Sequence, residues 1–159
     1  MGTMSSEIFD LFLTSINDYR LTSIYASSGS LVLDTYLEPW LLNSIVDFSD
    51  VCIEDLNYTA SGSATEGYFD AILSLEAKLI LAQIMVKYWL QKTVSDILQM
   101  NLHITDHDFK TFSSSQNLKA KQEYYILKCE EISQRLVNYG YKKNNWEQWK
   151  NQNFDGTGV

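Results

Sequence analysis

One long amphipathic run in the middle of the chain constrains the fold more than any other feature. From Leu75 to about Met100, apolar residues recur at three- and four-residue steps, and Ser74 directly precedes the run. This spacing predicts an α-helix, and serine is a favourable N-cap. Because the apolar face is wide, we expect the helix to have neighbours on more than one side. The sequence therefore predicts a mainly α domain of four to five helices around one long central helix.

A first amphipathic helix is predicted from Glu7 to Tyr25, with Ser5 or Ser6 capping its first turn. A second helix is predicted from Asp34, with Pro39 tolerated in its first turn. Its apolar stripe is formed by Leu37, Trp40, Leu41, Ile45, Val46 and Phe48. The segment between them, residues 31–33, is short and apolar, so it fits either a small strand or a buried loop.

The region 51–73 is predicted to hold a short β-hairpin. Val51–Leu56 is ambiguous between helix and strand, and Tyr68–Leu73 has the character of a strand that can pair with it. The small polar residues 57–67 between them predict a projecting, mobile loop. This loop also supplies candidate interaction residues. These are Asn57, Tyr58, Ser61, Gly62, Ser63 and Glu66.

The last long helix is predicted to open at Ser113, where capping-box spacing occurs, and to end near Tyr139, because Gly140 is a common stop signal. We divide the chain into a helical domain, residues 1–141, and an extended C-terminal arm, residues 142–159. Tryptophan anchors many interfaces, and aromatic residues stand out in the polar sequence of the arm and its junction. The candidate docking residues are Tyr141, Trp146, Trp149 and Phe154. We expect these residues either to dock on a neighbouring subunit or partner or to fold back over their own domain.

The charge is unevenly distributed along the 159 residues, whose net charge is −8. Residues 1–76 sum to −11, whereas residues 77–159 sum to +3. A strongly acidic protein is a poor sequence-specific duplex binder, because such binding depends on neutralising phosphates. The two halves either attract a second copy head to tail or neutralise each other within one subunit. No apolar run qualifies as a membrane span, since the longest contains Gln83 and Lys87.

The sequence holds no convincing catalytic or cofactor site. The best metal candidate is the cluster His103, Asp106, His107 and Asp108, but the expected cap at Thr105 would separate the two histidines. The acid pairs Glu54–Asp55 and Glu130–Glu131 fit solvated surface residues, and the two cysteines have no activating histidine nearby in sequence. We therefore expect no enzyme activity, no bound metal and no cofactor.

The order of segments resembles small, mostly helical head–tail connector (neck or adaptor) proteins of tailed phages that infect low-GC Gram-positive bacteria. The resemblance covers roughly residues 8–141. It rests on the following segments: residues 37–41 and 52–56, residues 77–82 and 85–90, the run Thr105–Ser113, Asn117–Lys119, and the helix end Tyr139–Tyr141.

This resemblance implies a structural virion protein at the head–tail junction, made in the cytoplasm of the host bacterium. It implies a homo-oligomeric ring, twelvefold in such proteins, that lies below the portal protein and above a downstream neck or tail protein. DNA passes through the ring without sequence-specific binding, and the loop of residues 57–67 projects into this channel or toward the next ring. The alternative is a soluble acidic helical binding or regulatory module, and an enzyme with a metal at His103–Asp108 is the third hypothesis.

Overall fold

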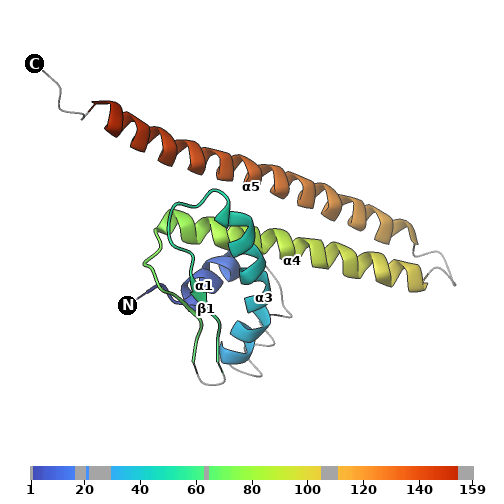
Figure 1. The fold of residues 1–159 in the computed structure, drawn as a ribbon. Coiled ribbons are helices and arrows are strands. Elements are labelled where there is room, and N and C mark those ends of the chain that lie inside the picture. The colour runs from blue at the N-terminus through green and yellow to red at the C-terminus, as the bar shows by residue number, and fades with distance from the viewer. Residues whose placement is uncertain (1, 17–20, 22–29, 63–64, 105–110, 154–159) are drawn as a thin grey trace, which may run out of the picture.

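The computed structural model describes residues 2–16, 21, 30–62, 65–104 and 111–153. The described helices are α1 (Ser5–Ser15), α3 (Ser30–Ser49), α4 (Leu75–Ile104) and α5 (Thr111–Asn153). A two-stranded antiparallel sheet joins β1 (Tyr58–Thr59) to β2 (Tyr68–Phe69). Figure 1 shows that α5 runs along α4, while α1 and α3 pack on another side of α4 and the hairpin lies beside α1 and α3. The predicted mainly helical fold with a short hairpin is confirmed.

Helix α4 is the centre of the fold, as its wide apolar face predicts. It contacts α1, α3 and α5, whereas α1 and α3 contact each other much less. Its buried residues point in nearly every direction around the helix axis, so α4 can support neighbours on several sides. These residues are Ala77, Ile80, Leu81, Ala82, Ile84, Met85, Val86 and Leu90. Ser74 caps the helix as predicted, because its Oγ accepts a hydrogen bond from the Ala77 amide at 3.2 Å.

Helix α1 is shorter than predicted and ends at Ser15 instead of Tyr25. The hydroxyls of Thr14 and Ser15 both donate to the carbonyl of Leu11, at 2.9 and 2.8 Å. Such side-chain bonds compete with the backbone ladder of a helix. The next residue, Ile16, is extended, with φ −123° and ψ 153°. Two consecutive hydroxyl residues therefore accompany the end of the helix, although apolar residues continue beyond them.

Helix α3 begins at Ser30, so the predicted start at Asp34 is wrong. The segment 31–33, expected as a strand or loop, forms the first turn, and Pro39 lies inside the helix. Proline donates no backbone hydrogen bond and is costly in a helix interior. Burial of one face offsets this cost, because Leu33, Leu37 and Leu41 are 3% exposed or less.

The hairpin has a different first strand from the one predicted. Tyr58 pairs with Phe69 and Thr59 with Tyr68, so the strand partner comes from the predicted loop and Val51–Leu56 forms no strand. The amides of Val51 and Cys52 instead donate to the Phe48 carbonyl and close the end of α3. The N-terminal residues occupy the other edge of β2, where the Phe69 amide donates to the Thr3 carbonyl at 2.8 Å.

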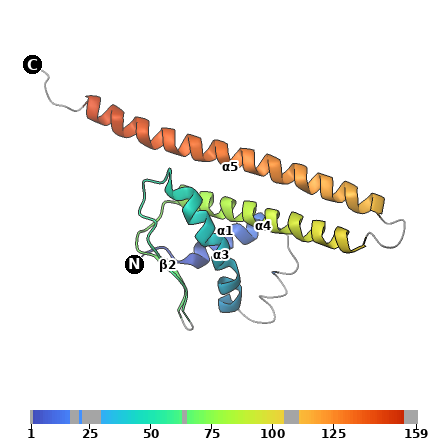
Figure 2. The same ribbon diagram turned by 45° about the vertical axis from the view of Figure 1, so that its right-hand side comes forward.

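Helix α5 continues through Gly140 to Asn153, so the predicted end at Tyr139 and the extended arm are both corrected. A glycine inside a helix costs only about 1 kcal/mol, and the turns on either side of it can offset that cost. Helix α5 also begins at Thr111, two residues before the predicted Ser113. Figure 2 shows its C-terminal part extending beyond the first turn of α4 and away from the other helices.

Candidate interaction surfaces

Glu38 of α3 holds the loop after β1 against the body of the protein. Its Oε1 accepts hydrogen bonds from the Tyr58 hydroxyl at 2.9 Å and the Ser61 amide at 2.6 Å. Its Oε2 accepts a third bond from the Ser61 hydroxyl at 2.8 Å. Two of the predicted loop residues therefore meet at one carboxylate of a preceding helix. Asn57 caps the other end of this segment, because its carbonyl accepts a bond from the Asp70 amide at 3.1 Å.

The hydrogen bonds at Glu38 stabilise its charged form. Burial alone would raise the pKa of this carboxyl, but the bonds from Ser61 and Tyr58 outweigh burial and lower the pKa below its ordinary value. Tyr58 responds in the opposite direction, since burial and its bond to Glu38 raise the pKa of the phenol. Glu38 is thus an ionised acceptor and Tyr58 a protonated donor at neutral pH.

The far side of the same loop caps α1. The Ser6 amide donates to Glu66 Oε1 at 2.6 Å, and the Ser5 amide donates to the Gly67 carbonyl at 2.9 Å. The predicted cap by the hydroxyl of Ser5 or Ser6 is therefore wrong, because a carboxylate sixty residues away takes that place. A negative charge also suits the positive end of the helix dipole.

Most of the predicted loop is thus attached to α1 and α3. The Gly62 amide donates a hydrogen bond to the Thr65 carbonyl at 2.9 Å and closes the loop. Ser63 lies outside the described residues. Gly67 has no room for a side chain, because an added Cβ would lie 2.0 Å from the Tyr58 hydroxyl. The role of this loop in a channel or between rings stays a prediction.

A polar network that the sequence did not reveal joins α5 to the start of α4. Glu54 accepts bonds from the Ser74 hydroxyl at 2.6 Å, the Ser74 amide at 2.8 Å and the Tyr139 hydroxyl at 3.2 Å. Cys52 Sγ lies 3.8 Å from the same phenol. Burial, followed by the bond to Cys52, raises the pKa of Tyr139 and keeps it protonated. Glu54 is therefore a structural acceptor and not the solvated surface acid predicted.

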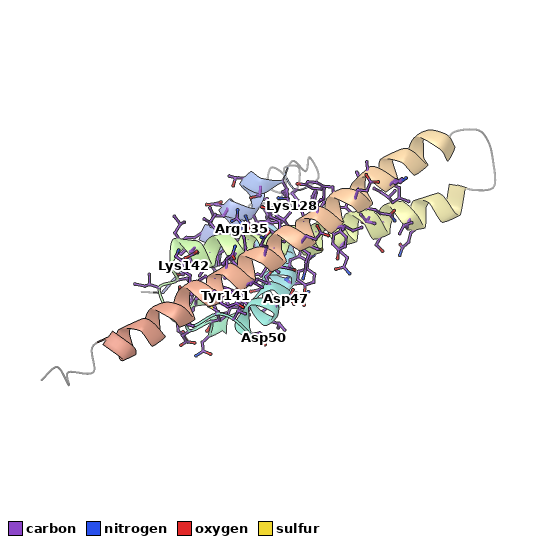
Figure 3. All side chains as sticks on the ribbon, turned by 90° about the horizontal axis from the view of Figure 1, so that it is seen from above. Asp47, Asp50, Lys128, Arg135, Tyr141 and Lys142 are labelled. Atoms are coloured by element: carbon purple, nitrogen blue, oxygen red, sulfur yellow. The ribbon has the colours of Figure 1, made fainter. Side chains whose placement is uncertain are left out.

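Three of the candidate docking residues, Tyr141, Trp146 and Trp149, lie on the C-terminal part of α5. Tyr141 is 66% exposed and lies next to Lys142, as Figure 3 shows. Trp146 and Trp149 belong to the last turns of α5, but the positions of their side chains lie outside the described structure, as does Phe154. The helix therefore brings Tyr141 and the two tryptophans onto one element, while their contacts stay a prediction.

Among the residues that the structure describes, three ion pairs connect the acidic first half of the chain to its basic second half. Lys78 pairs with Glu7 at 2.7 Å, Lys142 pairs with Glu76 at 3.3 Å, and a third pair joins Lys87 to Asp47. Neutralisation within one subunit therefore occurs, as one of the two interpretations expects. The neutralisation is partial, because these three pairs are few compared with the net charge of −11 on residues 1–76.

An open groove of about 670 Å³ lies between the first turns of α4 and residues 135–142 of α5. Its apolar floor includes Leu75 and Leu79, which are 66% and 37% exposed. Arg135 and Lys142 provide positive charge beside it, with Glu76 paired to Lys142. The remaining lining residues are Ile80, Asn138 and Tyr139.

Among the residues that the structure describes, no group of three or more histidine, cysteine or acidic side chains is placed to hold a metal. Three members of the predicted metal cluster, Asp106, His107 and Asp108, lie outside them. The described helices also include none that is long and apolar enough to cross a membrane. Comparison with protein-family models, with curated proteins and with solved structures found no match for this chain.

Proposed function

We propose that the chain is a non-enzymatic structural subunit of the head–tail junction of a tailed phage. In this proposal, copies form a ring below the portal protein and link it to a downstream neck or tail protein. The ring is twelvefold by resemblance and continues the DNA channel. A net charge of −8 suits such a conduit, because a basic lumen would bind the phosphates of passing DNA.

The observation that carries this proposal is the form of α5. This 43-residue helix packs on α4 by a narrow stripe, and among its described side chains at positions 118–142 only Ile132 and Tyr139 are buried. Beyond Lys142 it continues for eleven residues that include Trp146 and Trp149. A helix that extends past its own domain and carries large aromatic residues is suited to docking on a neighbouring protein.

Deleting residues 142–159 is expected to leave a folded subunit that no longer joins portal-bearing heads of its phage. The buried side chains that the structure describes on α5 precede the deletion, and among the described residues the deletion removes the Lys142–Glu76 ion pair, which is exposed and worth about 0–1 kcal/mol. Circular dichroism and thermal unfolding check the fold, and cosedimentation with heads measures incorporation.

A full-length double variant, Trp146→Ala with Trp149→Ala, tests the same idea without removing the helix. Its matched control is Gln148→Ala with Lys150→Ala, which changes two neighbouring polar residues. We expect the tryptophan variant to lose head binding by at least tenfold and the control to bind normally. Normal incorporation of the tryptophan variant would contradict docking by this arm.

The groove between α4 and α5 favours the alternative function, a soluble acidic helical binding or regulatory module. Its exposed leucines and flanking cations fit an apolar segment that carries an acidic group. In this case, Leu79→Asp would abolish binding to a partner protein in the host. The variant and the wild type would then not differ in their incorporation into heads.

A further inference from the structure

Helix α5 packs on the body through residues that recur at seven-residue steps. Tyr125 packs against the buried core, and the next two residues at this spacing, Ile132 and Tyr139, are 5% and 1% exposed. A seven-residue repeat is typical of a helix that keeps one side against a neighbouring helix. The next position of the repeat is 146, which is occupied by Trp146. The packing side of α5 therefore continues in sequence past Tyr139.

Helix α4 does not reach as far as this side of α5. Its first residue, Leu75, and the turn that follows face residues 135–142 of α5 across the open groove. Residues 143–153 of α5 continue for about 16 Å past that level, since a helix rises by about 1.5 Å per residue. Figure 2 shows this part of α5 lying apart from the other described helices. The projecting part thus has a packing side that no described helix of its own chain covers.

The residues on this uncovered side combine tryptophan with positive charge. At about 100° per residue, Trp149 and three lysines fall within about 60° of position 146. These lysines are Lys142, Lys143 and Lys150. The one acid among residues 142–153, Glu147, falls about 100° away, and Glu76 of α4 pairs with Lys142 alone of the three. The side of α5 that continues past α4 therefore stays net positive.

We propose that this side of α5, defined by Lys142, Lys143, Trp146, Trp149 and Lys150, binds an acidic amphipathic α-helix of a different protein. The partner helix lies along α5 where α4 would run if it were longer. Its apolar residues meet the two tryptophans, which are effective anchors, and its acids meet the lysines.

A second copy of this chain does not fit as the occupant through the same surface, because two such surfaces would bring lysines together. This inference deepens the proposed function. It rests on that function for the place of the partner helix, which is the portal-bearing head.

The test measures how the full-length protein binds two dye-labelled peptides, by fluorescence anisotropy in low salt. Each peptide has about 21 residues, in three heptads with leucine at the two core positions. One peptide carries glutamate at the four positions that flank the core of each dimer-forming heptad pair, and the other carries lysine there. We expect the acidic peptide to bind at least about tenfold more tightly than the basic peptide, and added salt to weaken its binding.

Two variants and a matched control place the binding on α5. Lys150→Glu reverses one charge of the proposed surface, whereas Lys119→Glu reverses an exposed lysine that falls about 180° from position 146 on the same helix. We expect Lys150→Glu, and separately Trp146→Ala with Trp149→Ala, to weaken binding of the acidic peptide at least about fivefold. Lys119→Glu should bind as the wild type does. Circular dichroism checks that each variant is folded.

Three results would overturn the inference. The first is that the acidic peptide does not bind, or binds no better than the basic peptide. The second is that binding of the acidic peptide withstands both surface variants. The third is a self-association of the wild type, measured by light scattering, that the tryptophan variant abolishes, because a second copy would then occupy this surface.

Portal-bearing heads separate this inference from the proposed function. If heads bind the wild type and not the tryptophan variant, but bind Lys150→Glu as tightly as the wild type, the acidic helix is wrong and the proposed function stands. If the acidic peptide binds as expected and heads do not bind the wild type, the surface on α5 stands and the proposed function is wrong.

Discussion

Replacing Tyr139 by alanine is expected to lower the free energy of unfolding by about 3–5 kcal/mol. The Tyr139 side chain is 1% exposed, and its ring centroid lies 5.2 Å from that of Phe48. Its removal leaves a cavity between α3 and α5 and takes away the hydroxyl that donates to Glu54 at 3.2 Å. Chemical denaturation followed by circular dichroism measures the change.

Two control variants separate the causes of this loss. Tyr139→Phe keeps the ring and removes only the hydroxyl, so it should cost about 1 kcal/mol. Tyr141→Ala removes a 66% exposed ring two residues away on the same helix and should change stability by less than about 0.5 kcal/mol. Equal effects of Tyr139→Ala and Tyr141→Ala would show that α5 does not pack on the body through Tyr139.

Replacing Glu38 by alanine is expected to lower the free energy of unfolding by about 2–4 kcal/mol, since hydrogen bonds to a charged group contribute about 1.5–3 kcal/mol each and are not additive. The variant leaves the Tyr58 hydroxyl and the Ser61 amide and hydroxyl without their acceptor. Glu38→Gln retains an acceptor oxygen and should lose less. A neutral result for Glu38→Ala would show that the loop is not held by this carboxylate.

The contribution of Glu38 should also depend on pH. Its pKa is lower in the folded protein than the ordinary value of 4.5, so the unfolded chain takes up a proton first as the pH falls. The stability gained from the charged form is therefore complete above about pH 5.5 and is lost as the pH falls through the folded pKa. The difference in stability between wild type and Glu38→Gln should be constant at neutral pH and shrink in acid.

The central helix was predictable from the sequence because its pattern is long and strongly periodic. Ser74 and the apolar steps after it specify α4 without reference to the rest of the chain. The boundaries of α1 and α3 were not predictable in this way. Side-chain bonds to the Leu11 carbonyl accompany the end of α1, and packing of Leu33 and Leu37 extends α3 through Pro39. In α3, burial of apolar side chains against the rest of the protein outweighs the unfavourable effect of a proline inside a helix.

The residues that hold the loop and α5 in place were the least predictable. Glu38, Glu54 and Glu66 resemble ordinary surface acids in sequence, yet each accepts hydrogen bonds from residues between 20 and 85 positions away. Such partners are brought together only by the fold, and no local spacing marks them. The one available signal was the excess of acids in the first half of the chain, which we interpreted as attraction between copies or as neutralisation within one subunit.

The most direct test of the central claim is the form that the purified full-length protein takes by itself and with portal-bearing heads. Light scattering over a concentration series, followed by negative-stain electron microscopy, would give the mass and the shape of any assembly. The proposed function predicts closed rings of identical subunits, formed either in solution or on the portal of the heads. A protein that stays monomeric at every concentration and does not bind those heads would contradict it.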